Sequence, residues 1–187
     1  QVVIWTTTPW TIPSNKAVVF GPDIKYGLYE VTARPDECWA NIGDRYILAD
    51  NLATGVMEKA RLDETMYRRL RDVSLESLTT IKLRHPLFSA KEANGEWDEI
   101  RDFRPADFVT DTEGTGFVHC APSHGPDDFN LCLNNGIKAI ETVDGDGKYT
   151  DIIPLFKGMH IFKANSLVIE KLKNEKNLLA SGELIHS

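Results

Sequence analysis

The sequence is poor in cysteine and contains no CxxC pair. Its three cysteines, Cys38, Cys120 and Cys132, are an odd number at wide spacing. This pattern argues against a disulfide framework and against a zinc site built on paired thiolates. It favours a reducing compartment, so we expect a cytoplasmic protein, with a mitochondrial location left open.

Long apolar runs are lacking as well. Hydrophobic residues make up 42% of the chain and charged residues 26%, and no run is long enough to cross a bilayer. The first residues, from Gln1 to Trp5, contain no initiator methionine, basic leader or small-residue cleavage site. We therefore expect a soluble single domain over residues 1–187, excised from a larger protein and without a membrane partner.

Basic residues are outnumbered, with 21 Lys and Arg against 28 Asp and Glu, which gives a net charge of −7 at pH 7. Strong unaided binding to nucleic acid is disfavoured, because neutralising phosphates requires clustered Lys and Arg. The local cluster of Arg68, Arg69 and Arg71 has acids nearby in the sequence and is interpreted as a solvated face. An RNA partner would therefore have to be held in part by other regions.

The first third of the chain is rich in strand-like segments. Short apolar or aromatic runs separated by Gly, Pro or Asp predict strands over residues 17–20, 26–32, 38–42 and 46–48. We expect these strands to form a barrel or a curled sheet. Asp50 suits the cap of a helix that runs to Lys59 and covers one side of the sheet. The segment from Leu70 to Phe88 is expected to be extended again.

Two turns and a closing helix are predicted farther along the chain. Asn94-Gly95 lies within a polar stretch, and residues 144–147 have the sequence DGDG; both are typical of tight turns. Residues 164–179 place apolar positions among Lys and Glu at a spacing that suits a helix.

A distinctive run, GTGFVHCAPSHGPDD, covers residues 114–128. Gly114 and Gly116 allow a sharp turn or a close approach to a ligand, and residues 117–121 are expected to form a buried strand. Pro126 suits the first position of a helix. Such a strand-to-helix junction is a natural ligand site.

The helix expected after this strand carries Asp127 and Asp128 in its first turn, where carboxylates complement the helix dipole. Residues 134–136, Asn-Asn-Gly, should end the helix. Its inward face is expected to hold Phe129, Cys132 and Leu133. Taken alone, two acids in a first helical turn are more often dipole partners, and a histidine on a strand is more often a core residue, so this segment by itself does not name a function.

A second distinctive run, WTTTPWT, covers residues 5–11. Its threonine hydroxyls lie beside two indole rings and offer donors, acceptors and stacking surfaces suited to a nucleoside. By itself the run fits equally well a strand of β-branched residues whose Trp5 and Trp10 belong to the core.

In order along the chain, WTTTPWT with Asn15 and then GTGxVHxAPxHGxDD resemble both signature segments of the editing domain of isoleucyl-tRNA synthetases. The resemblance extends over essentially the whole chain. The segment 153–158, IPLFKG, is similar to the family's passage out of this domain, and His186-Ser187 to its return toward the catalytic core. Valyl and leucyl relatives share the fold but usually lack WTTTPWT and the histidine at position 119, which favours the isoleucyl branch.

The resemblance implies an α/β fold built on a β-barrel with peripheral helices, of the valyl/leucyl/isoleucyl-tRNA synthetase editing type. It implies hydrolysis of misacylated valyl-tRNA(Ile), with valyl-adenylate as a further candidate substrate. The implied partners are the 3′ end of tRNA(Ile), valine or a similar small noncognate amino acid, and the remainder of the synthetase. Neither HIGH nor KMSKS occurs in the chain, so we expect it neither to activate amino acids nor to use ATP. The editing reaction itself is expected to need no metal or cofactor. ATP, Mg and ligase activity are expected only in the full-length enzyme.

The resemblance also implies roles for individual residues. Asp128 should bind the α-ammonium group of the substrate, and His119 should face its side chain and carbonyl. Thr6, Thr7 and Thr8 should contact the substrate and position the attacking water. A further set is expected to bind substrate: Trp10, Thr11, Asn15, Gly116, Phe117 and His124. The first two of this set should hold the terminal adenosine, while Asn15 also allows a structural role in a turn.

Two other function classes remain open on the residues alone. His119, His124, Asp127 and Asp128 could form a metal cluster for hydrolysis, although their spacing matches no strong metal motif. A catalytically silent RNA-binding module is the other class, and the acidic charge disfavours it.

No covalent nucleophile is expected. Ser123 lacks a GxSxG setting, and Cys120 lies in an apolar run without an evident activating base. Many relatives carry Thr and Gly at these two positions, so the chain departs from the family pattern at the edge of the expected pocket.

Overall fold

The computed structural model describes residues 1–153 and 155–183. Pro154, within the expected passage out of the domain, and His186-Ser187 therefore lie outside the described residues. The strands are β1 Ala17–Phe20, β2 Tyr26–Val31, β3 Arg45–Ala49, β4 Tyr67–Val73, β5 Lys82–Leu83, β6 Arg101–Pro105 and β7 Phe117–Cys120. The helices are η1 Pro9–Ser14, η2 Asp50–Leu52, α1 Ala53–Lys59, α2 Leu75–Thr80, η3 Lys91–Ala93, α3 Pro126–Asn134 and α4 Ile161–Asn174.

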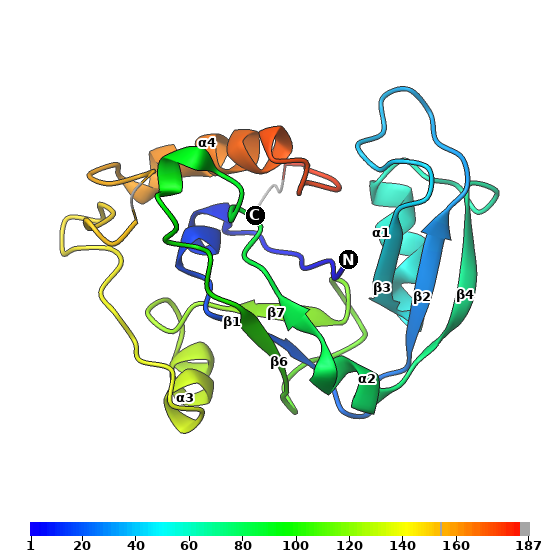
Figure 1. The fold of residues 1–187 in the computed structure, drawn as a ribbon, viewed down its shortest axis with the longest axis horizontal. Coiled ribbons are helices and arrows are strands. Elements are labelled where there is room, and N and C mark those ends of the chain that lie inside the picture. The colour runs from blue at the N-terminus through cyan, green and yellow to red at the C-terminus, as the bar shows by residue number, and fades with distance from the viewer. Residues whose placement is uncertain (154, 184–187) are drawn as a thin grey trace.

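The strands form two separate sheets, of four and three strands, in the orders β5-β6-β1-β7 and β3-β2-β4. Strand β1 runs parallel to β6 and antiparallel to β7, whereas the smaller sheet is antiparallel throughout. The smaller sheet and α1 lie to one side, and α4 and α3 lie around the larger sheet (Figure 1). The fold is therefore α/β. Both described sheets are open, so the structure does not show the expected closed barrel.

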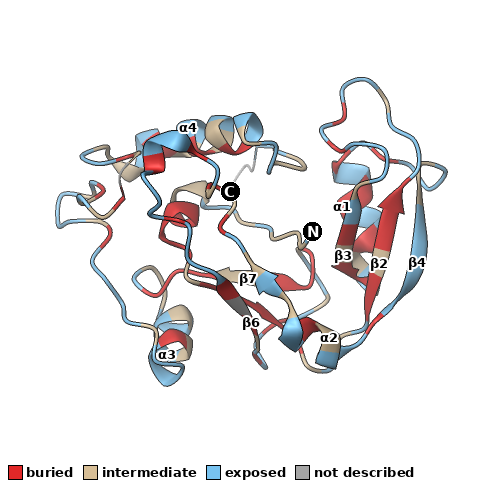
Figure 2. Cartoon of the chain, viewed as in Figure 1, coloured by how far each residue is buried: buried red, intermediate tan, exposed pale blue. Residues whose placement is uncertain are grey.

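Burial follows the strands because each sheet has an apolar face to cover (Figure 2). Helix α1 packs Val56 and Met57 into one cluster with Tyr29 and Leu48 of the smaller sheet. A second cluster holds β1 and β7 against residues of the smaller sheet, so the two sheets share a core. The strand predicted over 17–20 is confirmed as β1, and all four of its residues are buried.

The strand predicted over residues 38–42 is wrong. This segment forms turns, and the guanidinium of Arg34 donates to the carbonyl oxygens of Cys38 and Ala40 at 2.8 and 3.0 Å. Cys38 and Ala40 are buried against the cluster under α1. Their apolar character thus reflects packing rather than strand pairing.

The extended segment predicted over residues 70–88 is correct only in part. Strand β4 ends at Val73, and α2 follows at once because Ser74 Oγ accepts a hydrogen bond from the N–H of Ser77. Leu78 of this helix is fully buried. Packing of that single leucine and the serine cap therefore override the extended reading.

The predicted capping role of Asp50 is also wrong. Its carboxylate accepts from the hydroxyl of Tyr29 at 2.7 Å and from Nε of Arg69 at 3.0 Å, and the η2 turn stands between it and α1. Arg68 pairs with Glu30 at 2.6 Å. All three arginines of the basic cluster are exposed, so the predicted solvated face is confirmed, and two of them pair there with Glu30 and Asp50.

Both predicted turns are confirmed. Asn94 and Gly95 have φ values of 51° and 83°, and the N–H of Gly147 donates to the carbonyl of Asp144 at 3.0 Å. The closing helix begins at Ile161 and ends at Asn174 rather than spanning 164–179. Lys176 takes a φ of 59°, and this left-handed residue ends the helix. Among the described residues, no helix has both the length and the hydropathy that a membrane span requires.

Candidate active site

A cavity of about 350 Å³ lies where the N-terminal segment meets β7 and the start of α3. It brings together six of the residues predicted for the site: Thr6, Thr7, Gly116, Phe117, His119 and Asp128. Residues from two runs that lie about a hundred residues apart in the sequence therefore line the same cavity. The volume falls in the range of small-molecule sites.

The N-terminal segment reaches this cavity because the smaller sheet holds it. Val2 pairs with Ile47 of β3 in a parallel bridge, and the hydroxyl of Thr115 donates to the carbonyl of Val3 at 2.6 Å. The N–H of Ala49 donates to the carbonyl of Thr115 at 3.0 Å. The threonines that follow Val3 are thus fixed relative to the turn that precedes β7.

Gly116 is required at this turn for two reasons. Its φ is +85°, and an added Cβ would lie 2.4 Å from Cβ of Ala49. Its carbonyl accepts a hydrogen bond of 2.7 Å from the buried hydroxyl of Tyr26. The backbone at Gly116 therefore packs directly on the smaller sheet while it lines the cavity.

His119 is held in one tautomer by two side chains behind it. The hydroxyl of Thr11 donates to the carbonyl of Thr8, so its oxygen accepts from Nε2–H of His119 at 3.1 Å. The amide of Asn15 lies 3.5 Å from Nδ1 of the ring and donates to it. Burial, with a smaller effect from His124, lowers the pKa of His119 to about 4. The imidazole is therefore neutral at pH 7.

Asp128 lies in the first turn of α3, after the N-cap Gly125 and Pro126 at the first helical position, as predicted. Its Oδ2 accepts a hydrogen bond of 2.9 Å from the N–H of Ala121. Burial raises the pKa of Asp128, and the charge of Asp127 raises it further, whereas the Ala121 bond lowers it. The carboxylate thus joins the end of β7 to the start of α3, at a residue that lines the cavity.

The predicted inward face of α3 is correct only at one position. Cys132 is fully buried, but Phe129 is 43% exposed and Leu133 is 59% exposed. The helix packs on β1 and β7 near its C-terminal end, through Cys132 and the partly buried Leu131. The end predicted at residues 134–136 is confirmed, because α3 stops at Asn134 and Gly136 takes a φ of 71°.

Five of the predicted residues are not among the described residues that line the cavity: Thr8, Trp10, Thr11, Asn15 and His124. Thr8 is tied to Thr6, whose Oγ1 accepts from its N–H at 3.0 Å. Thr11 and Asn15 lie behind His119, as described above. These two residues do not line the cavity; their side chains contact the ring nitrogens of His119 and orient its imidazole.

Trp10 and His124 pack together away from the cavity wall. Their rings meet edge to face with centroids 4.8 Å apart. The backbone N–H of Trp10 donates to the side-chain oxygen of Asn165 in α4 at 2.9 Å. Nε2 of His124 lies 2.9 Å from the hydroxyl of Thr142 and 3.1 Å from that of Ser14. The predicted roles of Trp10 and His124 in binding substrate remain predictions.

Trp5 and Gly114, from the two distinctive runs, also line the cavity. Four further lining residues had not been singled out from the sequence: Phe108, Thr110, Glu113 and Val118. Three of them come from the loop between β6 and β7, which has no periodic pattern. Phe108 is 43% exposed, between the exposed Asp107 and the buried Val109, and this exposure is visible only in the structure.

Neither candidate nucleophile is activated in the structure. Cys120 is fully buried, and burial raises the pKa of its thiol well above the ordinary value. Ser123 is exposed and its hydroxyl donates to the carbonyl of Ile140. Within residues 1–153 and 155–183, no three His, Cys, Asp or Glu side chains are grouped so that they could hold a metal ion.

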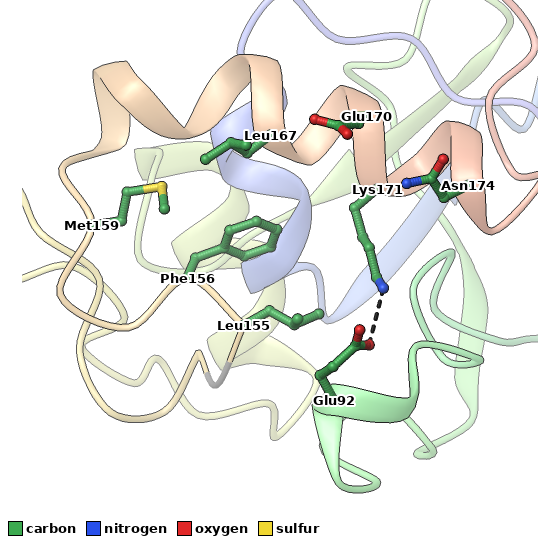
Figure 3. Close-up of a pocket in the computed structure, with 8 residues that line it drawn as sticks. All are labelled: Glu92, Leu155, Phe156, Met159, Leu167, Glu170, Lys171 and Asn174. Carbon is green, nitrogen blue, oxygen red and sulfur yellow. Dashed lines mark hydrogen bonds and ion pairs between the residues drawn. The ribbon is translucent and has the colours of Figure 1, made fainter.

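A second cavity, of about 260 Å³, lies between α4 and η3. Leu155, Phe156 and Met159 project into it, and Lys171 crosses toward Glu92, with 3.0 Å between Nζ and Oε2 (Figure 3). None of the predicted site residues lines it. Its one charged pair is already satisfied, so the chemistry expected from the sequence lies in the first cavity.

No family model matches the chain. Over its full length the chain is 56% identical to an isoleucine–tRNA ligase of Ruegeria pomeroyi and 47% identical to one of Pelagibacter ubique. It spans 20% and 19% of those proteins, or about a fifth of their length.

Two solved structures have a similar fold at low sequence identity. GlLeuRS-CP1 matches with a TM-score of 0.71 at 14% identity, over 94% of this chain and 77% of that one. The editing domain of the P. knowlesi cytosolic leucyl-tRNA synthetase matches with a TM-score of 0.61 at 12% identity, over 94% and 82%. These likenesses establish the fold, and the ligase sequences establish the ancestry.

Proposed function

Because this chain belongs to the isoleucine–tRNA ligase family, of whose members it spans about a fifth, and has the fold of a synthetase editing domain, we propose that it hydrolyses misacylated valyl-tRNA(Ile). The observation that carries the proposal is the single cavity lined by Thr6, Thr7, His119 and Asp128. Valyl-adenylate presents the same valyl and adenosine groups and is a second candidate substrate.

Hydrolytic editing is needed because binding alone cannot distinguish isoleucine from valine well enough. Isoleucine and valine differ by one methylene, which is worth only about 1–3 kcal/mol in a pocket, a value established on synthetases of this same family. A second site that admits valine and excludes isoleucine turns the size difference into hydrolysis of the wrong product.

In the proposed reaction, a water oxygen attacks the carbonyl carbon of the ester. The bond between that carbon and the ribose oxygen breaks, the ribose oxygen takes a proton, and valine and tRNA are released. Asp128 binds the α-ammonium group of the valyl moiety through a charge-assisted hydrogen bond. Thr6 and Thr7, on the opposite run of the cavity lining, place the water, and Thr8 holds Thr6 in position.

His119 acts in this proposal by shape and position. Its pKa of about 4 leaves it uncharged at pH 7, and both ring nitrogens already face Thr11 and Asn15. A ring committed in this way is a poor proton carrier. The ring instead forms a rigid surface that limits the size of the amino acid side chain the cavity admits.

The proposed partners are the 3′ end of tRNA(Ile), valine or a similar small amino acid, and the rest of the synthetase. The net charge of −7 implies that the rest of the enzyme supplies most of the contacts to tRNA phosphates. We propose that editing needs no metal or cofactor, and that ATP and Mg serve only the ligase activity of the full-length enzyme. We propose a cytoplasmic location, with a mitochondrial one as the alternative.

The test compares the rates at which the chain deacylates valyl-tRNA(Ile) and isoleucyl-tRNA(Ile), with and without a chelator. A full-length isoleucine–tRNA ligase carrying the same segment is the reference. Selective and chelator-resistant loss of valine is the expected result. Loss of activity with chelator would indicate a metal-dependent hydrolase, and binding of tRNA without hydrolysis by either protein would indicate an RNA-binding module.

A further inference from the structure

Two exposed aromatic rings line the candidate cavity. Trp5 is 41% exposed and Phe108 is 43% exposed, and both belong to the cavity lining together with His119 and Asp128. They come from segments about a hundred residues apart in the sequence. Large aromatic rings gain most of their stabilising energy when buried, so rings left open beside polar groups point to a ligand.

Trp5 is held in place from two directions. A Cβ built on Gly114 would lie 3.6 Å from Cε3 of its indole, so the backbone of that turn packs on the ring. The ammonium of Lys59, at the end of α1, lies 5.8 Å from the ring centroid. Its exposure therefore belongs to a ring positioned by the fold.

Phe108 is positioned by a turn with buried ends. The N–H of Val109 donates to the carbonyl of Ala106 at 3.3 Å, and the N–H of Ala106 donates to the carbonyl of Phe20 at 2.9 Å. Ala106 and Val109 are 8% and 7% exposed and pack in one core cluster. The turn is thus anchored on β1, and its two exposed residues are Asp107 and Phe108.

We propose that Trp5 and Phe108 bind the adenine base of the aminoacyl adenosine by stacking. This inference rests on the proposed function, because it assigns the base of the same substrate to a part of the same cavity. The sequence offered the indoles of both Trp5 and Trp10 as stacking surfaces, and the resemblance implied Trp10 and Thr11 for the adenosine. The ring of Trp10, however, packs on His124 and is not part of the cavity lining.

Stacking suits an acidic chain that recognises the end of an RNA. An acidic protein gains little from the phosphates, whereas an aromatic ring binds the face of a base without any charge. The cavity supplies an acid, Asp128, for the ammonium end of the substrate. The two rings supply a separate surface for the base end.

The test uses two hydrolysis-resistant probes. The first is valine in amide linkage to 3′-amino-3′-deoxyadenosine, and the second is the same amide on a ribose that carries hydrogen in place of adenine. Dissociation constants of both probes are measured for the unaltered 187-residue chain and for Trp5→Leu and Phe108→Leu. Phe162→Leu is the matched control, because Phe162 is 78% exposed but does not line the cavity.

For the unaltered chain and for Phe162→Leu, we expect adenine to tighten binding by about 5- to 150-fold, the range for one stacked base. For Trp5→Leu and Phe108→Leu this advantage should shrink, while the probe without a base binds as before. Trp5→Phe should restore much of the advantage. Equal weakening of both probes would mean that the rings only support the fold, and it would overturn the inference.

The remaining outcomes separate the two proposals. If the unaltered chain prefers the adenine probe and keeps this preference in both leucine variants, the stacking inference is wrong and the editing function stands. If that preference is lost in Trp10→Leu instead, the base binds at Trp10, as the resemblance implied. If neither probe binds and valyl-tRNA(Ile) is not hydrolysed, the proposed function itself fails.

Discussion

Two replacements of Asp128 separate its proposed role in binding substrate from its role in the fold. Its Oδ2 accepts a hydrogen bond of 2.9 Å from the N–H of Ala121, a residue that is fully buried. Asp128→Ala removes both the charge and this acceptor. Asp128→Asn removes the charge but keeps an oxygen in the same place, so it is the matched variant.

The two variants should differ in stability and agree in activity. In Asp128→Ala, an unpaired buried N–H costs about 1–3 kcal/mol of unfolding free energy, and loss of the carboxylate at the start of α3 costs about 0.3–1 kcal/mol. Asp128→Asn should lose only the second contribution. Both should lose the bond to the α-ammonium, worth about 1.5–3 kcal/mol or about 10- to 150-fold in kcat/KM.

Thermal unfolding and deacylation of valyl-tRNA(Ile) are measured on the same preparations. At this chain length, 1 kcal/mol corresponds to about 2–4 °C in Tm, so the alanine variant should melt several degrees below the asparagine variant. Full hydrolytic activity in a folded Asp128→Asn would refute the ammonium assignment. Equal Tm values for the two variants would refute the structural role of the Ala121 bond.

Three further predictions concern His119, Gly116 and His85. His119→Ala should reduce the preference for valyl over isoleucyl ester by about 10- to 200-fold, the range for one methylene. An unchanged ratio of the two deacylation rates would show that His119 does not discriminate between the two side chains. Gly116→Ala should lower the free energy of unfolding by about 1–3 kcal/mol more than Gly43→Ala, because both glycines have positive φ but only Gly116 lacks room for a Cβ; equal losses in denaturant melts would contradict this. Burial lowers the pKa of His85 to about 3, below the value near 6.5 of an unfolded chain, so its contribution to stability is complete above pH 6.5 and is lost as the pH falls toward 3. His85→Gln should remove up to about 1.4 kcal/mol per pH unit from the slope of stability over pH 4–6.5, and parallel melting profiles for the two proteins would show that another group titrates there.

The family and the centre of the site could be predicted from the sequence because their signals are local. A glycine on either side of Thr115 gives the turn, and a proline followed by two acids gives the start of α3. Strand β1 and both later turns were predicted for the same reason. Backbone preferences and caps act within a few residues, so a linear sequence displays them.

The failed predictions share a different cause. Cys38 and Ala40 are apolar because they pack under α1, and α2 forms because Leu78 finds a buried position. The residues that these side chains pack against are distant in the sequence, and the local cap at Ser74 was not recognised as the start of a helix. Propensity and spacing could therefore mark these residues as apolar but could not say which element they belong to.

The sequence by itself determined the family, the junction at Gly116 and the residues expected around Asp128. Only the tertiary structure decided which of them share one cavity, and it placed Phe108 there and Trp10 outside. The reason is that β1 pairs with both β6 and β7, as Val18 does with Phe103 and with His119. Such pairings join segments that are far apart in the chain, and burial of their common core, rather than any local pattern, fixes which rings remain open to a ligand.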